Sequence, residues 1–381
     1  MRVLFTSGNT GGHLYPILAV KRELDKCLNF LETKYGKILP KEFLTRDYLF
    51  LGGDLKGKET MLQEEDIETK KIISIKWRRY FSFQNFLDVL KTPFSFLQAS
   101  FLIWSFMPDI VFSKGGPGSF AVVIASWLYR IPVVIHESDS VPGKTNKFSA
   151  PFAKKITVSF KGGNAIFKKN KVVFTGHPVR QMLTNGSKER AKEMFNLTGE
   201  RKVILIMGGS QGAQQINLVF LDAFYKYIKD YEIIHICGQK NFKETNLLTS
   251  ALLKKEQKKF YHLYPSLGED KIKEAYAITD LVISRAGAGS LFEIAALKKP
   301  NIIIPLENSA GDHQQLNAQI FGEKGCGIVI EAQNISPNIV YITAKDLLER
   351  EEQTKKIINA CKKFYKPDAA QKIAETIIET V

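Results

Sequence analysis

Short apolar runs alternate along this chain with longer segments in which apolar residues recur at helical spacing. The runs are almost continuously apolar, and this pattern is typical of parallel strands whose two faces are both covered by helices. The predicted strands are residues 3–6, 48–51, 72–75, 109–113, 132–137, 156–159, 172–176, 203–209, 232–238, 261–264, 280–284, 301–305 and 327–330. The predicted helices include residues 92–108, 212–229, 289–298 and 312–324.

The pattern restarts in the middle of the chain. VLFTSGNTGG near the N-terminus and VILIMGGSQGA near residue 203 each place a glycine-rich turn between a strand and a helix. A single core stops growing at about 250–300 residues, so a chain of 381 residues favours two doubly wound α/β domains. We place them at residues 1–180 and 181–360, and we expect the last helix, about residues 360–381, to pack back on the first domain.

Charge and cysteine content narrow the function classes. The net charge is +15, and residues 1–200 hold 30 basic against 18 acidic residues. This excess favours an anionic partner, such as nucleic acid, an acidic membrane surface or a phosphorylated substrate, although a lysine-rich solvated surface accounts for it equally well. The four cysteines are far apart, which argues against zinc and disulfides. Without a signal sequence or a span of about 20 apolar residues, we expect a cytosolic chain.

Four glycine turns follow predicted strands. They are Gly8–Gly12, Gly115–Gly118, Gly208–Gly212 and Gly287–Gly289. Glycine allows close approach of a ligand to the backbone, and the next helix N-terminus attracts phosphate, so the turns predict a phosphate-bearing ligand between the two domains. The nicotinamide fingerprint GxGxxG, the phosphate loop GxxxxGK[ST] and a DxD motif do not fit here. We therefore expect no metal and no tightly bound cofactor, with phosphate charge neutralised by helix dipoles and basic residues.

Further polar residues gather at predicted strand ends. The segment 135–147 contains His136, Glu137, Asp139 and Asn146, and Arg180 ends TGHPVR. Glu293 lies one turn inside a helix that follows a glycine turn, where a carboxylate suits sugar hydroxyls better than a diphosphate. Each residue alone has a structural explanation, as a helix cap or a packed core histidine. Because all of these residues lie near predicted strand ends, we favour a functional role over these structural explanations.

These motifs together resemble a known family, the MurG glycosyltransferases. TGGH (10–13), GG (115–116), IHE with PG and TNK (135–147), PVR (178–180), GGSQGA (208–213), EIAA (293–296) and HQ with NA (313–318) occur in the family's order over nearly the whole chain. That family makes lipid II for peptidoglycan by adding N-acetylglucosamine from UDP-N-acetylglucosamine to undecaprenyl-diphospho-N-acetylmuramoyl-pentapeptide, lipid I. The resemblance implies a GT-B architecture, in which two Rossmann-like doubly wound domains face a cleft.

The resemblance also assigns residues. It implies His13 as the general base of an inverting transfer to the muramoyl C4 hydroxyl. The implied UDP-N-acetylglucosamine contacts are Thr10, Gly11, Gly12, Asp139, Arg180, Ser210, Ala288, Glu293, Gln314 and Gln315. The candidates on the acceptor side are Gly115, Gly116, His136, Glu137 and Asn146. Asp139 replaces the family's asparagine, so that a carboxylate would face the anionic nucleotide-sugar there, and His177 replaces another asparagine before PVR.

The resemblance predicts a peripheral enzyme on the cytoplasmic face of the cell membrane. Its expected partners are the two substrates, anionic lipids and other proteins of cell-wall synthesis, but not nucleic acid. Residues 76–106 contain ten aromatic residues with Lys76, Arg78, Arg79 and Lys91, a mixture suited to a membrane surface, although core packing explains many of these rings. Two alternatives remain: a UDP-N-acetylglucosamine epimerase of similar fold, and a basic nucleic-acid-binding protein.

Overall fold

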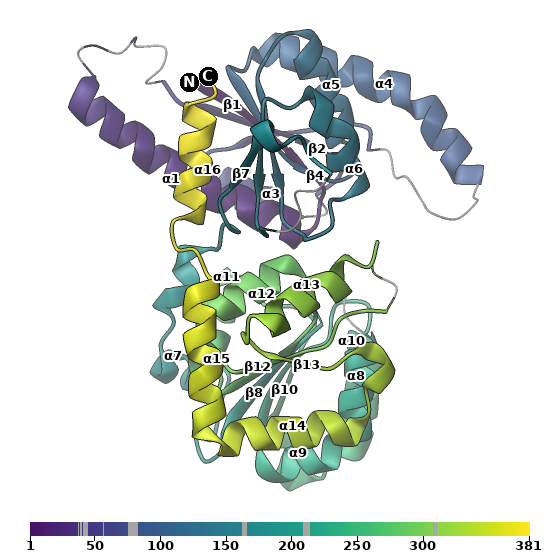
Figure 1. Cartoon of the computed structure of the whole chain (residues 1–381). Helices are drawn as coiled ribbons and strands as arrows, with labels where there is room; N and C mark the ends of the chain where they lie inside the picture. Colours follow the sequence, from purple (N-terminus) through teal and green to yellow (C-terminus); the bar gives the residue numbers. More distant parts are fainter. Residues whose placement is uncertain are drawn as a thin grey trace. The chain divides into compact units, whose positions relative to one another are not determined.

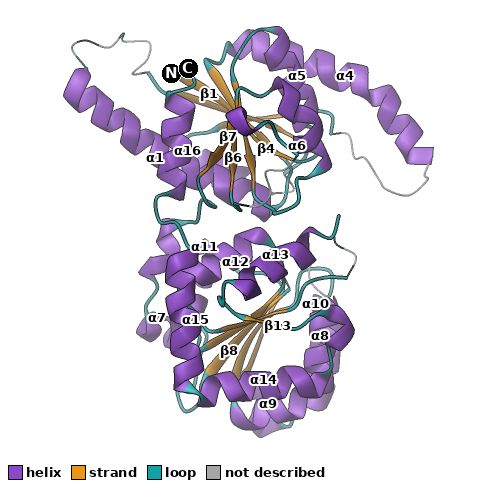
Figure 2. Ribbon diagram, in the orientation of Figure 1, coloured by secondary structure: helices purple, strands orange, loops and turns teal. Residues whose placement is uncertain are grey.

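The structure, a computed structural model, divides the chain into two compact units. Unit 1 comprises Met1–Val179 and Pro367–Val381, and unit 2 comprises Arg180–Lys366 (Figure 1). The described residues are 1–381 without 37, 39, 41–44, 56, 75–82, 162–165, 209–213, 308 and 310, and the description of residues 83–90 covers the backbone only. Both units are parallel sheets with helices on each side, so the predicted fold class is confirmed (Figure 2).

Unit 1 contains a seven-stranded parallel sheet of order β3-β2-β1-β4-β5-β6-β7. The strand order reverses between β1 and β4, which is where ligands bind in open α/β sheets. The strands are β1 (Arg2–Ser7), β2 (Asp47–Gly52), β3 (Glu68–Lys71), β4 (Ile110–Gly115), β5 (Val133–Glu137), β6 (Lys155–Val158) and β7 (Val172–Phe174). The helices are α1 (Gly11–Tyr35), α3 (Glu59–Gln63), α4 (Phe83–Phe106), α5 (Ser119–Leu128), α6 (Lys144–Ser149) and α16 (Ala369–Ile378), with 3-10 turns η1 (Ala150–Phe152) and η2 (Lys169–Lys171).

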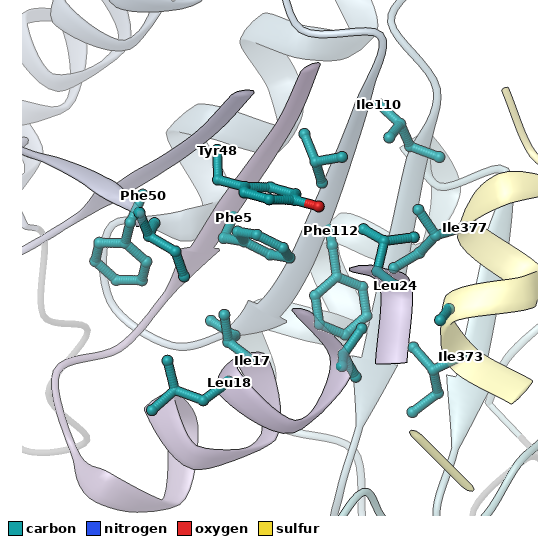
Figure 3. Packing of buried hydrophobic residues seen from close by; sticks show 14 of the residues in the cluster. Phe5, Ile17, Leu18, Leu24, Tyr48, Phe50, Ile110, Phe112, Ile373 and Ile377 are labelled. Carbon is teal, nitrogen blue, oxygen red and sulfur yellow. The ribbon is translucent and has the colours of Figure 1, made fainter. Parts of the chain in front are cut away.

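The core of unit 1 joins both ends of the chain. Phe5 of β1 and Phe112 of β4 pack edge to face beneath α1, and Ile373 and Ile377 of α16 belong to the same cluster (Figure 3). The C-terminal helix α16 therefore packs beside α1 on one face of the sheet. The opposite face is covered by α4 and α5, whose buried residues include Ile103.

Unit 2 contains a six-stranded parallel sheet of order β10-β9-β8-β11-β12-β13. Its strands are β8 (Val203–Met207), β9 (Glu232–Ile236), β10 (Tyr261–Tyr264), β11 (Leu281–Ser284), β12 (Asn301–Ile303) and β13 (Ile328–Val329). Its helices are α7 (Lys188–Met194), α8 (Gln214–Asp222), α9 (Phe224–Asp230), α10 (Phe242–Leu252), α11 (Glu269–Ile278), α12 (Ala288–Ala296), α13 (His313–Glu323), α14 (Pro337–Glu349) and α15 (Glu351–Phe364), with 3-10 turns η3 (Gln181–Asn185), η4 (Lys255–Phe260) and η5 (Ala332–Asn334).

Two predicted elements differ from the structure. The third strand lies at 68–71 rather than 72–75, because the polar ETKK segment pairs with β2 at the sheet edge, while Ile72 turns into the core. The predicted helix 212–229 is two helices, α8 and α9, separated at Ala223, whose φ of −103° and ψ of 10° lie outside helical geometry. Residues 92–108 form most of α4, as predicted. Among the described residues, no helix has both the length and the apolar character needed to cross a bilayer.

Candidate functional site

Two glycine turns meet at the carboxyl edge of the unit 1 sheet. Gly8, which follows β1, donates its backbone N–H to the carbonyl of Gly115 at 2.8 Å. Gly116 has a φ of +94°, and a Cβ at this position would lie 2.7 Å from the nitrogen of Gly8. Only glycine suits both the backbone conformation and the close approach. The two turns predicted from sequence therefore form one surface.

His13 projects from the first turn of α1 into this surface. Its Nδ1 lies 2.7 Å from Oγ1 of Thr10, the N-cap residue of the helix. The missing side chains of Gly8 and Gly116 make room for the ring, since a Cβ on Gly8 would lie 2.9 Å from Nδ1 and a Cβ on Gly116 3.3 Å from Nε2. When Nδ1 donates to Thr10, Nε2 carries the lone pair and can accept a proton.

The pKa of His13 is far below that of an ordinary histidine. Burial, together with the positive charges of Lys114 and Lys58, lowers it to about 3. The imidazole is therefore neutral at physiological pH, and its position at a helix N-terminus also opposes the imidazolium. The pKa of about 6.5 that an unperturbed histidine has does not apply here, because desolvation opposes the imidazolium.

Lys114 is a charged residue of this site that sequence reasoning missed. The β1–β4 pairing passes from Thr6 and Ser113 to Ser7 and Gly115, so Lys114 is the extra residue of a bulge. Bulges redirect a side chain and are common beside active sites. The residue is 5% exposed, and burial lowers the pKa of its ammonium, while the nearby carboxylates of Glu137 and Asp139 oppose that shift. In the sequence Lys114 stands between Ser113 and Gly115, one residue after the predicted strand 109–113, and nothing there indicates a bulge.

Glu137 and Asn146 shape the loop after β5. Glu137 Oε1 accepts the backbone N–H of Asp139 at 3.0 Å, and Oε2 accepts the N–H of Gly143 and the Nδ2 of Asn146 at 3.0 and 2.8 Å. Glu137 and Asn146 are both buried. Burial raises the pKa of Glu137, and the charge of Asp139 adds to this effect. The structure gives these two acceptor-side candidates a role in holding the loop that carries Asp139.

His136 lies behind that loop rather than on its surface. It is fully buried, with Nδ1 2.9 Å from Thr157 Oγ1 and Nε2 3.3 Å from Ser159 Oγ. His177 shares Ser159, whose Oγ lies 3.2 Å from His177 Nδ1. Burial lowers the pKa of both imidazoles, that of His177 to about 3. Both histidines therefore stay neutral and stabilise the sheet edge.

In unit 2, two predicted residues bind each other. Arg180 donates from Nε and Nη2 to Oε1 of Glu293 at 3.2 and 2.7 Å, and from Nη1 to Oε1 of Glu269 at 3.3 Å. The Arg180 side chain is 5% exposed and that of Glu293 is 13% exposed. Tyr276 donates its hydroxyl to Oε2 of Glu293 at 3.4 Å. The Glu293 carboxylate is therefore held on both oxygens.

The remaining donor-side candidates lie on neighbouring loops. Ala288 begins α12, directly after the glycine turn at Gly287. Gln314 is buried and accepts the N–H of Leu306 on Oε1 at 3.3 Å, whereas Gln315 is exposed. Ser210 lies outside the described residues. Arg285, at the carboxyl end of β11, is a further residue that the sequence analysis missed, and burial lowers the pKa of its guanidinium.

Comparison with known proteins identifies the family. The Glycosyltransferase family 28 N-terminal domain matches residues 39–158, and the C-terminal domain of the same family matches residues 203–373. A relative from Clostridium botulinum is 36% identical over 100% of this chain and 98% of its own length. It is named "UDP-N-acetylglucosamine--N-acetylmuramyl-(pentapeptide) pyrophosphoryl-undecaprenol N-acetylglucosamine transferase". The chain belongs to this family of transferases.

Solved structures agree on the fold of this family 28 glycosyltransferase. The MurG of Acinetobacter baumannii superposes with a TM-score of 0.70 at 22% identity, over 99% of both chains. A UDP-GlcNAc 2-epimerase from Neisseria meningitidis bound to UDP-GlcNAc superposes with a TM-score of 0.68 at 17% identity, over 100% of both chains. At these identities the likeness concerns the fold alone. The relative of 36% identity is a transferase, so the epimerase alternative is not better supported.

Proposed function

We propose that this chain transfers N-acetylglucosamine from UDP-N-acetylglucosamine to the C4 hydroxyl of undecaprenyl-diphospho-N-acetylmuramoyl-pentapeptide, with inversion at the anomeric carbon. The main support for this proposal is that the chain matches, along its whole length, a relative named as a transferase for these substrates. The acceptor hydroxyl attacks the anomeric carbon, the bond from that carbon to the diphosphate oxygen breaks, and UDP leaves.

In this proposal His13 takes the proton of the attacking hydroxyl on Nε2. The Thr10 hydroxyl fixes the ring through Nδ1, and the two glycine turns leave room for an acceptor beside it. A pKa of about 3 makes the free ring a weak base. A diphosphate bound nearby favours the imidazolium, because an opposite charge within a few ångströms raises the pKa of a histidine. Substrate binding thus raises the pKa of His13 and makes it a stronger base for the transfer step.

In unit 2, Glu293 accepts hydrogen bonds from the ribose hydroxyls of the donor. The N–H groups at the start of α12 and the guanidinium of Arg180 supply positive charge for the departing diphosphate. This assignment follows the family resemblance and is consistent with the burial of Arg180 beside Glu293.

In this proposal unit 1 meets a membrane surface, because the acceptor is linked to a lipid. Phe94, Phe101 and Trp104 of α4 are more than 60% exposed, whereas Phe96 and Phe106 pack against the core. A pocket of about 160 Å³ begins beside Gly116 and is lined by Phe120, Phe148 and Lys144, a mixture of apolar surface and positive charge that suits a diphosphate-linked lipid. The other aromatic residues of the predicted membrane patch lie outside the described side chains.

Product analysis tests the proposal. Labelled UDP-N-acetylglucosamine and a short-chain lipid I analogue should give labelled disaccharide-lipid and UDP in equal amounts. His13→Ala, which removes the proposed base, should reduce the rate of product formation. Conversion of UDP-N-acetylglucosamine to its 2-epimer without acceptor would instead support the epimerase, and the absence of both products would contradict the proposal.

A further inference from the structure

Glu293 lies in an environment that fixes its carboxylate before any ligand arrives. Arg180 contacts Oε1 with two nitrogens, and Tyr276 contacts Oε2 with its hydroxyl. These partners come from separate parts of unit 2, since Arg180 precedes η3, Tyr276 lies on α11 and Glu293 lies on α12. A carboxylate with a partner on each oxygen cannot rotate without losing a hydrogen bond.

The hydroxyl group of Tyr276 makes few polar contacts apart from the one to Glu293. Its side chain is fully buried, and the hydroxyl contacts only Glu293 Oε2 and the sulfur of Met207, each at 3.4 Å, among the described residues. A thioether is a weak acceptor, so the carboxylate is the polar partner. Met207 ends β8, which places the hydroxyl at the carboxyl edge of the sheet, where the proposed donor binds.

Helix α11 holds this arrangement at two points. Glu269, in its first turn, accepts from Arg180 Nη1, and Tyr276, two turns later on the same face, donates to Glu293. Arg180 is thereby shared by two carboxylates, and Glu293 is shared by Arg180 and Tyr276. The helix, which begins after its N-cap Gly268, is thus connected to both sides of the Arg180–Glu293 ion pair, although it follows none of the four predicted glycine turns.

We infer that Tyr276 is a positioning residue for donor recognition, which orients the Glu293 carboxylate toward the ribose hydroxyls of a uridine nucleotide. This inference rests on the proposed function, because it takes the ribose as the ligand of Glu293. Tyr276 does not touch the nucleotide, and its effect passes through Oε2 of Glu293. Preorganisation of this kind increases affinity by reducing the ordering that binding requires.

Binding of UDP and of 2′,3′-dideoxy-UDP, measured by titration calorimetry, tests the inference without acceptor or catalysis. The wild-type chain should bind UDP more tightly than the dideoxy nucleotide. Tyr276→Phe should weaken UDP binding about three- to tenfold, since a hydrogen bond to a charged group is lost, and should leave dideoxy-UDP binding unchanged. In a Glu293→Ala background, Tyr276→Phe should have no further effect on UDP binding.

Tyr227 provides a matched control. It is another buried tyrosine of unit 2, and its hydroxyl has no hydrogen-bond partner within the described part of the chain. Tyr227→Phe should leave both affinities unchanged, and thermal melting of each variant checks that the fold is intact. An equal loss of affinity for both nucleotides in Tyr276→Phe, no loss at all, or additivity with Glu293→Ala would overturn the inference.

The binding test of this inference and the product analysis of the proposed function can fail independently of each other. If wild-type chain does not distinguish the two nucleotides, Glu293 does not recognise ribose and the inference fails, even where product analysis finds transfer. If wild-type chain distinguishes them and Tyr276→Phe, unlike Tyr227→Phe, reduces the distinction, the inference holds, even where no disaccharide-lipid is formed.

Discussion

Arg180 and Glu293 are 113 positions apart in the sequence and form a nearly buried ion pair, with Nη2 2.7 Å from Oε1. Both residues were predicted as separate contacts of the nucleotide-sugar. The structure joins them and adds Glu269 as a second partner of the guanidinium. Removing one member of a buried pair leaves the other charge uncompensated, so their substitution effects should be coupled.

A double-mutant cycle tests this coupling. Glu293→Ala should raise the KM for UDP-N-acetylglucosamine about 10- to 100-fold with little change in kcat, because hydrogen bonds to the ribose are lost. Arg180→Ala should raise the same KM and also lower kcat, because it removes charge beside the leaving diphosphate. We expect the combined variant to lose less than the sum of the two free-energy changes. Strict additivity would show that the pair does not act as a unit.

His13→Ala should lower kcat about 10²- to 10⁴-fold, the usual cost of losing a general base, while the donor KM changes little. Steady-state kinetics with both substrates measure this.

His13 remains neutral in the free enzyme down to about pH 3, so it should produce no acidic limb in kcat/KM between pH 5 and 8. Lys114→Met removes one of the charges that lower this pKa and should shift the limb toward neutral pH. If His13→Ala stays within a few-fold of the parent, another group is the base.

The close approach of the two glycine turns makes Gly116 sensitive to any side chain. Gly116→Ala places a Cβ 2.7 Å from the Gly8 nitrogen at a φ of +94°, so the turns must separate and shift His13. We expect kcat to fall at least about tenfold and stability to fall by about 1–3 kcal/mol, the range for a strained backbone position. Gly268→Ala is the control, because a Cβ there meets no atom within 4 Å. An active, stable Gly116→Ala variant would contradict this account of the turns.

Sequence reasoning found the turns, because a buried strand followed by glycines and a helix is a local pattern. It also placed His13, Arg180 and Glu293 at strand ends. It could not pair Arg180 with Glu293 or bring Tyr276 to the same carboxylate, since those contacts depend on how α11 and α12 pack. Lys114 was missed for a different reason. A bulge is defined by the register between two strands, which one strand's sequence does not reveal.

The exposed rings of α4 should bind lipid surfaces. Phe101 and Trp104 lie 6.3 Å apart between ring centroids and are both exposed, and unit 1 contains most of the chain's basic excess. Sedimentation with anionic liposomes should recover wild-type chain and less of the double variant Phe101→Ala, Trp104→Ala. Leu247→Ala, at an exposed apolar residue of unit 2, is the control. Equal recovery with neutral liposomes, or no loss in high salt, would refute the electrostatic part.

Buried neutral histidines should make unit 1 the more acid-sensitive unit. Unit 1 contains His13, His136 and His177, all with lowered pKa values, whereas His235 is the histidine of unit 2 whose pKa burial lowers to about 3. In the unfolded chain each has a pKa near 6.5, so the unfolded state binds more protons between about pH 6.5 and 3. Stability from these groups is therefore complete above about pH 6.5 and decreases as the pH falls, by about 2 kcal/mol at pH 5 for a fully buried histidine such as His177, and by less for the half-buried His13. Glu137 opposes this trend, because its pKa is raised and the folded state gains its proton first.

Hydrogen exchange resolved by peptide measures the two units separately. Between pH 7 and 5, the opening free energy of β5 and β7 should decrease more steeply than that of β9. His177→Asn removes one titrating group and offers an amide to Ser138 and Ser159, the partners of Nδ1 in the parent. It should reduce the slope for unit 1 by up to about 1.4 kcal/mol per pH unit and leave the slope for unit 2 unchanged. Equal slopes in the two units of the parent chain, or an unchanged slope in His177→Asn, would show that these imidazoles titrate normally in the folded chain.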